Sequence, residues 1–443
     1  MKKIIKYIIA GLLIAPVITI SSCKKDINEQ NKINPNAFSD SDPALMITGA
    51  QLANVMANEG EAARLACIFA GHLTGYDRQF ISYGLYSMNA GDFDGPWGTI
   101  YADGIAQCRL VKAKAIAANN KVLEGVAQIT EANLLLTTSS LWGDIPNSEA
   151  CNDNILTPKF DKMSDVYNYC ISILEAAAAN VGSSSAYSAA YSGSFTWKEV
   201  ANTLIARAKL HKKDYAGAIA AASAGVSDGN DFKANHATAS PGAWNLYYDF
   251  LDWNRAGYIS CDGSYIVNML DSGTSASKRD AKTDETARFD YYFLKDNYTP
   301  IDPNMYGGVF DAQADFPLCS YVENELILAE CYARTSNDTS ALQHLNNVRA
   351  SHEANFGGYQ AYDASDFATN SALILNILKE KYVSLFGQVE VYNDVRRTGN
   401  VIGVPANAGT VLPGRFLHPQ SERNTNPKTP AAGTLFDKLE LFQ

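Results

Sequence analysis

The sequence predicts a mainly α-helical protein, from the period of its apolar residues, two helix-start motifs and a repeated pattern of small and bulky side chains. From residue 43 onward, apolar residues recur at intervals of three or four over most of the chain, which is the spacing of one helix face. The expected helices are Pro43–Asn58, Ala62–Thr74, Trp97–Ala118, Leu123–Leu141, Ser164–Ala179, Trp197–His211, Tyr215–Val226, Tyr321–Arg334, Ser340–Ala350 and Ala372–Leu385.

Two of these helices begin with a capping-box pattern. Thr196 is followed three residues later by Glu199, and Ser320 by Glu323. In such a box the hydroxyl and the carboxylate each accept a hydrogen bond from a free backbone N–H of the first turn. Both positions are therefore predicted to be helix N-termini.

Two helix pairs share the residue offsets of a tetratricopeptide repeat. In the first, Leu328, Ala329 and Tyr332 are followed by Ala341, Leu345 and Val348; in the second, Ile205 and Ala206 are followed by Ala218, Ala222 and Gly225. Small residues let two antiparallel helices approach closely, and bulky ones fill the groove between repeats. The sequence therefore predicts helix pairs packed side by side.

A long segment, about residues 229–317, interrupts this pattern. Helical periodicity fades there, and from Trp244 to Tyr306 there are 13 aromatic residues in 63, about twice the 11% of the whole chain. A long irregular insertion in a compact protein is more often functional than idle.

The N-terminus has the pattern of a secretory signal. Lys2, Lys3 and Lys6 precede a nearly continuous apolar run over 8–20, and Ser21 and Ser22 lead to Cys23. The run is short and contains Pro16, so it does not suit a membrane span of about 20 residues. We expect a signal peptide at 1–22, a lipidated Cys23 with a flexible tether at 23–42, and one folded domain at 43–443. The alternative is an ordinary signal peptide with an incidental cysteine.

Composition excludes several classes of function. Removing the signal takes three lysines and no acidic residue, so the formal net charge falls from −11 to −14, which disfavours a nucleic-acid partner. Seven further cysteines occur without a C-x-x-C motif; most suit buried positions, and one disulfide, involving Cys151, stays open. No H-E-x-x-H motif or glycine-rich phosphate loop is present, so no metal, cofactor or catalytic residue is expected.

The candidate ligand site lies in two aromatic-rich irregular segments, Tyr76–Tyr86 and Trp244–Tyr258. Flat aromatic rings flanked by amides and charged groups suit sugar rings, which have apolar faces and polar edges. Trp97, at the start of an amphipathic helix, is expected in the core instead. The candidate ligand-binding residues are Tyr76, Asp77, Arg78, Tyr83, Tyr86, Trp244, Tyr248, Asp252, Trp253, Asn254 and Tyr258; the two segments are expected to lie near each other.

Four further stretches are distinctive. They are L-W-G-D-I-P from Leu141, ARAKLHKKDYAGAIAAA from Ala206, E-N-E-L-I-L-A-E-C-Y-A from Glu323, and a tail with E-K-Y-V-S-L-F-G-Q from Glu380, D-V-R-R-T-G from Asp394 and P-G-R-F-L-H-P-Q-S-E-R-N-T-N-P from Pro413. Together they resemble the SusD/RagB family of outer-membrane nutrient-binding lipoproteins. Read from the residues alone, Trp142 to Pro146 ends a helix. The charged residues Arg396, Arg397, Arg415, Glu422 and Arg423 are expected to tie the C-terminal segment onto the helices.

The resemblance implies a right-handed superhelix of four tetratricopeptide-like pairs, about 121–180, 197–227, 320–351 and 371–397, with a loop-rich ligand-binding part. It also implies a lipid-anchored protein of the outer membrane, facing the cell exterior, with a SusC-like TonB-dependent β-barrel transporter as its partner. The expected function is non-enzymatic capture of an oligosaccharide for that transporter. An oligopeptide ligand, a surface glycoside hydrolase using Asp249 and Asp252, and a purely architectural repeat protein are the alternatives.

Overall fold

The computed structural model describes residues 41–239, 241–294 and 300–443. The expected signal peptide, Cys23 and nearly all of the expected tether lie outside the described residues. The chain divides into two compact units, Met1–Leu45 and Met46–Gln443. Within the described residues, no helix is both long and apolar enough to span a membrane.

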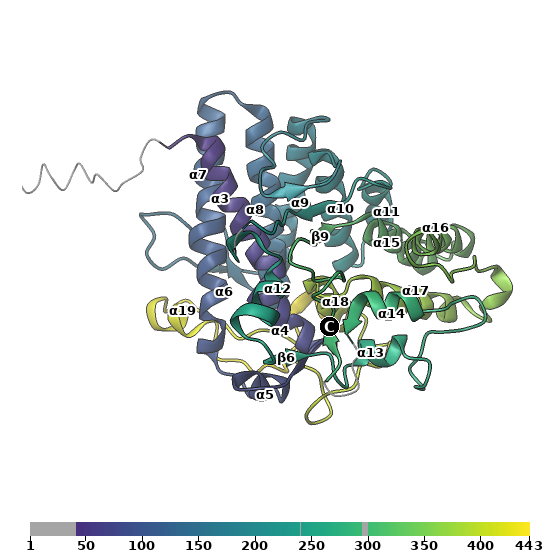
Figure 1. The fold of residues 1–443 in the computed structure, drawn as a ribbon. Helices are drawn as coiled ribbons and strands as arrows, with labels where there is room; N and C mark the ends of the chain where they lie inside the picture. The colour runs from purple at the N-terminus through teal and green to yellow at the C-terminus, as the bar shows by residue number, and fades with distance from the viewer. Residues whose placement is uncertain (1–40, 240, 295–299) are drawn as a thin grey trace, which may run out of the picture. The chain divides into compact units, whose positions relative to one another are not determined.

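The described chain is mainly helical, as predicted (Figure 1). Its α-helices are α3 Pro43–Glu59, α4 Glu61–Phe69, α5 Gln79–Gly84, α6 Asp94–Gly98, α7 Ala106–Ala117, α8 Lys121–Trp142, α9 Met163–Val181, α10 Trp197–His211, α11 Tyr215–Ala222, α12 Leu246–Tyr248, α13 Tyr265–Leu270, α14 Thr286–Tyr292, α15 Tyr321–Arg334, α16 Asp338–Phe356, α17 Asn370–Ser384, α18 Val389–Arg397 and α19 Gln420–Thr425.

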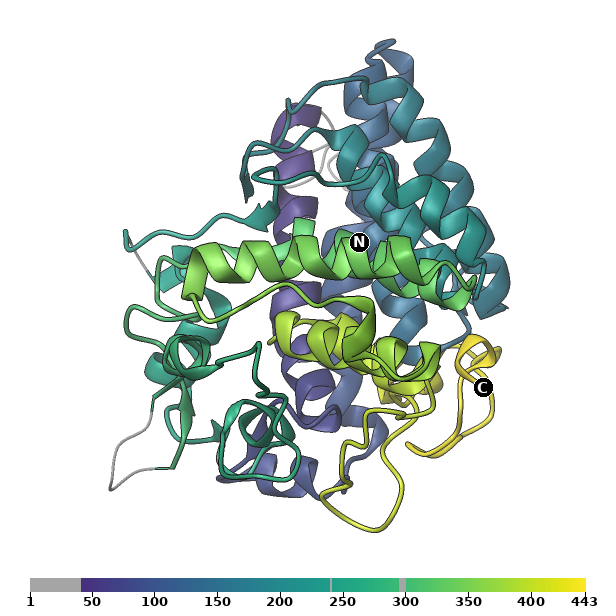
Figure 2. The ribbon, with the colours of Figure 1, turned by 90° about the vertical axis from the view of Figure 1, so that its right-hand side faces the viewer.

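The long helices pack in consecutive pairs. Helix α8 packs against α9, α9 against α10, α10 against α11, α11 against α15, and α15 against both α16 and α17. Figure 2 shows the light-green helices of the later pairs nearest the viewer and the blue and teal helices of the earlier pairs to the upper right. Helix α8 is buried over almost its whole length, so it is the central helix of this stack.

Strands are short and serve to join distant segments. They are β1 Thr74–Gly75, β2 Ile145–Pro146, β3 Phe160–Asp161, β4 Tyr191–Ser192, β5 Phe232–Ala234, β6 Ile259–Ser260, β7 Phe293–Leu294, β8 Asp302–Pro303 and β9 Phe316–Cys319. All pairings are antiparallel, in the orders β1-β6, β2-β3, β4-β5-β9 and β7-β8.

Of the two expected capping boxes, one is complete. The Thr196 side chain accepts from Glu199 N, and the Glu199 carboxylate accepts from Thr196 N at 2.9 Å. Ser320 caps α15 by accepting from Glu323 N at 3.1 Å, but the Glu323 carboxylate does not return the bond. It pairs instead with buried Arg207 at 2.7 Å, because a buried guanidinium needs a counter-charge.

The Trp142–Pro146 segment is structural, as its residues predict. Gly143 ends α8 with φ +88°, a conformation that favours glycine. The Trp142 indole Nε1 donates to Leu417 O at 2.8 Å. Asp144 Oδ1 accepts from Met163 N at 2.9 Å, which satisfies a free donor at the start of α9.

Three of the five C-terminal charged residues fasten the tail as expected. Arg396 donates to Ser140 O at 2.7 Å, Arg415 to Trp142 O at 2.8 Å, and Arg397 to the buried Glu330 carboxylate at 2.5 Å. The other two do not reach the helix pairs. Glu422 accepts from Asn426 and Arg423 donates to Pro430 O, both within the tail itself.

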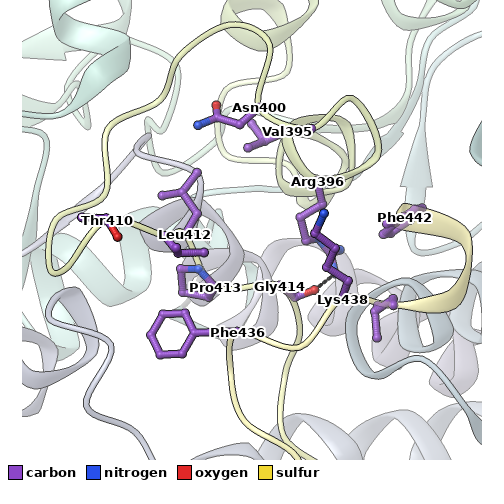
Figure 3. A pocket seen from close by; sticks show the side chains of 13 residues that line it. Val395, Arg396, Asn400, Thr410, Leu412, Pro413, Gly414, Phe436, Lys438 and Phe442 are labelled. Atoms are coloured by element: carbon purple, nitrogen blue, oxygen red, sulfur yellow. Dashed lines mark hydrogen bonds between the residues drawn. The ribbon is translucent and has the colours of Figure 1, made fainter.

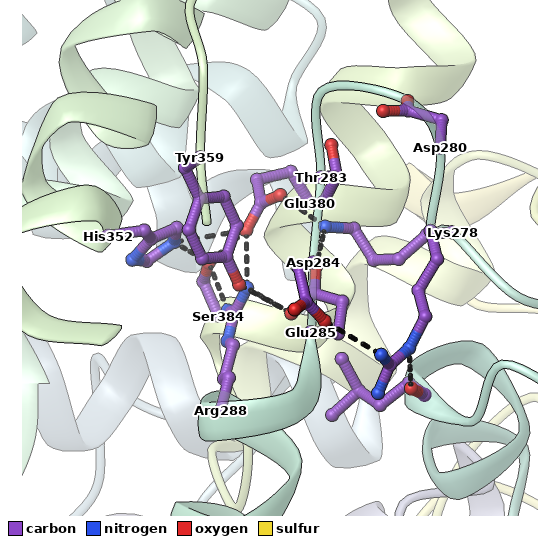
Figure 4. A network of polar contacts seen from close by, with 12 residues as sticks. Lys278, Asp280, Thr283, Asp284, Glu285, Arg288, His352, Tyr359, Glu380 and Ser384 are labelled. Atoms are coloured by element: carbon purple, nitrogen blue, oxygen red, sulfur yellow. Dashed lines mark hydrogen bonds and ion pairs between the residues drawn. The ribbon is translucent and has the colours of Figure 1, made fainter. Parts of the chain in front are cut away.

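The insertion is fastened to α17 by a buried ionic network (Figure 4). Lys278 donates to Glu380 at 2.7 Å and also to Glu285, and Arg288 donates to Glu380 at 2.8 Å. His352 Nε2 lies 3.0 Å from the same Glu380 carboxylate. Four ionic side chains and one imidazole thus hold the segment around α13 and α14 in place.

Six of the seven cysteines in the described residues are buried, and all seven are free. Cys151, which the sequence left open as a disulfide partner, is an exposed thiol with φ +55°.

Candidate ligand-binding site

The two aromatic-rich segments of the sequence lie next to each other. Strand β1 pairs with β6, with Gly75 opposite Ile259, and Tyr76 N donates to Tyr258 O at 2.9 Å. Behind this junction the Phe80 ring contacts the rings of Phe250 and Tyr258, at centroid distances of 5.4 and 6.2 Å. A short ladder and a buried aromatic contact therefore join segments that are far apart in the sequence.

Four aromatic side chains from the insertion form a cluster that we call the aromatic platform: Trp244, Tyr248, Trp253 and Tyr306. The Trp244 ring contacts Trp253 at 5.7 Å and Tyr248 at 5.3 Å, both edge to face. Trp253 is 65% exposed and Tyr306 60% exposed. Large aromatic side chains with this exposure, gathered in one place, are unusual on a protein surface without a partner.

Asp252 links the two ends of the platform. Its carboxylate accepts a hydrogen bond from the Tyr306 hydroxyl, which raises the pKa of Tyr306 to about 12. A hydrogen bond to Asp252 also raises the pKa of Tyr248. Both phenols are therefore neutral donors at physiological pH, with their rings held in place by a shared acceptor.

The backbone beneath the platform has an uncommon conformation. Asn245 is fully buried and caps α12 by accepting from Tyr247 N at 2.9 Å, while its amide donates to Ala314 O. Helix α12 continues directly into a π-helix, η4, at Asp249–Asn254. Single-turn π-helices occur frequently at functional sites, and this one carries Asp252 and Trp253.

A hollow of about 350 Å³ opens beside η4. Its apolar wall includes Met56, Ala57, Pro96, Leu246 and Phe250, and its polar groups are Glu61, Arg64, Thr99 and Asp249. Thr99 begins a second π-helix, η2 at Thr99–Ile105. Both π-helices of the described residues thus contribute to one hollow. We call it the α4 hollow, after the helix that supplies Glu61 and Arg64.

Arg64 is the main donor in the α4 hollow. Its guanidinium lies over the Phe250 ring at 4.1 Å, and Nη1 makes one long bond, 3.4 Å, to Leu246 O. Burial lowers the pKa of Arg64, and Nε is buried without a hydrogen-bond partner among the described residues. Burial likewise raises the pKa of Glu61, against the opposing charge of Arg64. The described residues therefore leave part of the donor capacity of Arg64 unused.

The structure brings most of the sequence-predicted residues of the second segment together. Trp244, Tyr248 and Trp253 belong to the platform, and Asp252 accepts the hydrogen bonds that link it. Exposed Asn254 donates to Asp249 at 2.7 Å. Tyr258 is half-buried, with the Arg255 guanidinium 5.9 Å from its ring.

The first segment matches expectation less well. Tyr76, Asp77 and Arg78 are exposed, and Asp77 pairs with Arg78 at 3.3 Å. Tyr83 is half-buried and donates to Asp92. Tyr86 is a correction, because it is only 7% exposed: its hydroxyl accepts from Asn407 N and its ring packs on Phe69. A ligand cannot stack on it.

Three residues of the site were missed from sequence. Tyr306 belongs to the aromatic-rich stretch, but its partner Asp252 is 54 residues away, and no local signal links them. Glu61 and Arg64 lie on a helix whose apolar face is typical of core, and nothing in the sequence distinguishes them from solvated charges. Trp97 is 5% exposed, in the core as expected.

Another hollow, of about 240 Å³, lies within the C-terminal tail and is lined in part by Arg396, Leu412, Phe436 and Lys438 (Figure 3). Arg396 is already saturated there. It donates to Tyr392 O, Gly414 O, Ser140 O and Asn393. The Arg396 guanidinium is therefore structural, and the aromatic platform with the α4 hollow is the better candidate site.

Stacked helix pairs that carry an aromatic, loop-built surface define a helical-repeat ligand-binding protein. Two family models match the sequence: one described as starch-binding associating with outer membrane, over residues 35–240, and one described as the SusD family, over residues 241–433. The chain belongs to the SusD/RagB family.

Solved structures share the fold. A SusD/RagB family protein from Bacteroides thetaiotaomicron is 18% identical, with a TM-score of 0.65 over 88% of this chain and 95% of that one. A chitin-binding SusD homolog from Flavobacterium johnsoniae is 15% identical, with a TM-score of 0.67 over 90% and 95%. A SusD homolog from Bacteroides uniformis is 14% identical, with a TM-score of 0.69 over 91% and 100%. No curated protein matches the sequence.

Proposed function

We propose that this protein is a non-enzymatic glycan-binding lipoprotein, held by Cys23 in the outer membrane and facing the cell exterior, that delivers an oligosaccharide to a SusC-like TonB-dependent transporter. The observation that carries the proposal is the aromatic platform beside the α4 hollow. Trp253 offers a solvent-facing ring for stacking on a sugar. Arg64, Glu61 and Asp249 offer charged groups for its hydroxyls, in a hollow next to the same π-helix.

The charges in the α4 hollow favour a neutral ligand. Charged groups of both signs line the hollow, Arg64 on one hand and Glu61 and Asp249 on the other. A charged ligand would therefore be attracted by one group and repelled by another. Planar donors and acceptors of both signs suit hydroxyl groups, which donate and accept at once. A β-linked N-acetylglucosamine oligomer is the first probe to use, because one structural neighbour is described as chitin-binding.

The experiment is a screen of the purified domain, residues 43–443, against immobilised glycans, followed by calorimetry on each hit. We expect binding of at least one neutral oligosaccharide with a Kd between about micromolar and millimolar, because only a few stacking and hydrogen-bond contacts exceed the cost of association. Binding of short peptides with no glycan hit would favour the oligopeptide alternative.

If the protein were a hydrolase, Asp249 and Asp252 would be its catalytic carboxyl groups. Asp249 accepts from Asn254 and Asp252 from Tyr306 and Tyr248, so both carboxylates already serve local structure. A glycosidase needs one such group held protonated as an acid. Release of reducing ends from a bound glycan, abolished in Asp252→Asn, would establish the hydrolase reading and refute ours.

The partner is tested in native membranes. Gentle detergent extraction and capture through a C-terminal tag should bring down a large β-barrel protein, and Cys23→Ala should release the protein from the membrane. Capture of the protein by itself from intact membranes would contradict delivery to a transporter and leave the architectural or free-standing binding alternatives.

A further inference from the structure

A buried acid–imidazole pair fastens the aromatic platform to the helical scaffold. Glu59, the last residue of α3, is fully buried. Its Oε1 accepts from Leu246 N, the first amide of α12, at 2.7 Å, and its Oε2 lies 2.9 Å from His236 Nε2. The Glu59 carboxylate therefore contacts both the N-terminus of α12 and the His236 imidazole.

The surroundings of His236 favour its charged form. Burial lowers the pKa of His236, but the hydrogen bond and charge of Glu59, the Ala243 carbonyl and the charge of Asp315 together raise it above the ordinary value. Asp315 also accepts from His236 N at 2.9 Å. On the other side, Arg64 of α4 is the cation that faces Glu59. Glu59, Asp315 and the Ala243 carbonyl thus stabilise the charged imidazole, while Arg64 interacts with Glu59.

We propose that Glu59 and His236 are positioning residues for the platform, and that glycan binding depends on the charge of His236. When His236 is protonated, the ion pair fixes the Glu59 carboxylate, and this carboxylate fixes the N-terminus of α12, from which Tyr248, Asp252 and Trp253 follow. When His236 loses its proton, the buried Glu59 carboxylate has a weaker partner. Its hydrogen bond then holds the N-terminus of α12 less firmly. This inference rests on the proposed function for its binding readout.

The direction with pH follows from the raised pKa. The pair is complete below the ordinary histidine pKa of about 6.5 and is lost as pH rises through the higher folded value. Binding should therefore weaken in mildly alkaline solution.

The test compares wild type with His236→Gln and Glu59→Gln. Glutamine at 236 cannot change charge, and glutamine at 59 keeps an oxygen for Leu246 N while removing the negative charge. The matched control is His211→Gln, which removes another buried histidine paired with a glutamate, Glu390 at 3.0 Å, in the helical scaffold.

Two readouts are measured at about pH 6 and about pH 9: affinity for the N-acetylglucosamine hexamer by calorimetry, and amide hydrogen exchange of the peptides covering 244–254. Exchange of these peptides is expressed relative to that of α8 peptides of the same protein in the same buffer, because the intrinsic pH dependence of exchange acts on both. In wild type and the control we expect affinity to fall about tenfold, equivalent to about 1.4 kcal/mol. Exchange in 244–254 should rise in wild type relative to peptides of α8. In His236→Gln and in Glu59→Gln, neither the affinity nor the exchange in 244–254 should show this dependence on pH.

The outcomes separate this inference from the proposed function. If the hexamer fails to bind at any pH but exchange in 244–254 still depends on His236, the positioning role stands and the choice of glycan is wrong. If wild type shows no pH dependence in either readout, or if His236→Gln keeps it unchanged, the positioning role is refuted while glycan binding is unaffected.

Discussion

The Tyr306 hydroxyl donates a hydrogen bond to the Asp252 carboxylate, joining an exposed residue to a half-buried one that lies 54 residues away in the sequence. The bond closes the aromatic platform, because Asp252 precedes Trp253 in the π-helix and Tyr306 comes from the far end of the insertion. A binding surface built from irregular chain is thereby held in shape before any ligand arrives, which reduces the ordering that binding would otherwise require.

Removing this bond should weaken binding without unfolding the protein. Tyr306→Phe keeps the ring and loses the donor, so we expect affinity for a bound glycan to fall about threefold to tenfold, equivalent to about 1 kcal/mol for one hydrogen bond. The hydrogen bond to Asp252 and partial burial raise the pKa of Tyr306 to about 12. An absorbance titration of tyrosinate should therefore lose one late step in the variant. An unchanged affinity would show that Tyr306 does not shape the site.

Trp253 should be the strongest single contributor to binding. Because its side chain is 65% exposed, Trp253→Ala should leave the melting temperature nearly unchanged while weakening binding at least about tenfold, or about 1.4 kcal/mol. Leu156→Ala is the control: Leu156 is 89% exposed and lies outside the site, so neither quantity should change. Loss of folding in Trp253→Ala would identify Trp253 as a core residue.

Arg397 should be essential for stability. It is buried and bonds both Glu330, at 2.5 Å, and Asp394, at 2.6 Å. Arg397→Met leaves these carboxylates without their main partner, so the free energy of unfolding should fall by about 3–5 kcal/mol. Arg423→Met, which removes only a bond to Pro430 O within the tail, should change it by less than about 0.5 kcal/mol. Equal effects in a denaturant titration would refute a fastening role for Arg397.

Stability should fall in mild acid. Burial lowers the pKa of His72 to about 3 and of His418 to about 4, and burial with the Arg288 charge lowers that of His352. These imidazoles are neutral in the folded protein, while the unfolded chain takes up protons below about pH 6.5. Each therefore contributes a stability loss of up to about 1.4 kcal/mol per pH unit between its unfolded and folded pKa.

The test of this acid sensitivity is the melting temperature of wild type and His418→Gln between about pH 7 and pH 4. Wild type should melt lower as pH falls, and the variant should show a shallower decline because it has one titrating group fewer. A flat profile in wild type would mean that these histidines are not neutral in the fold. These three histidines destabilise the fold as pH falls, whereas the pair of His236 with Glu59 is lost as pH rises.

Helical periodicity and cap chemistry predicted much of the scaffold, because both are local properties of the sequence. The Thr196 box and the α8 terminus at Gly143 follow from residues within one turn. Glu323 shows where local reasoning ends: its partner, Arg207, is 116 residues away, and a buried charge overrides a cap.

The candidate site was predictable only in part, for the same reason. Its aromatic composition is visible in the sequence, but its assembly depends on two-residue strands such as β1 and β6, which leave no periodic signal. Tyr86 and Tyr76 look alike as residues in an irregular segment. Packing of the C-terminal tail, through Asn407, is what buries Tyr86.

The most direct test of the account observes the tryptophan indole N–H signals by NMR while a glycan hit from the screen is titrated. Each signal is assigned by a single Trp→Phe variant. We expect the signals of Trp244 and Trp253 to shift with one shared Kd, while those of the buried Trp97, Trp142 and Trp197 stay in place. Saturable binding that leaves the Trp244 and Trp253 signals unmoved would contradict the assignment of the aromatic platform as the glycan-binding site.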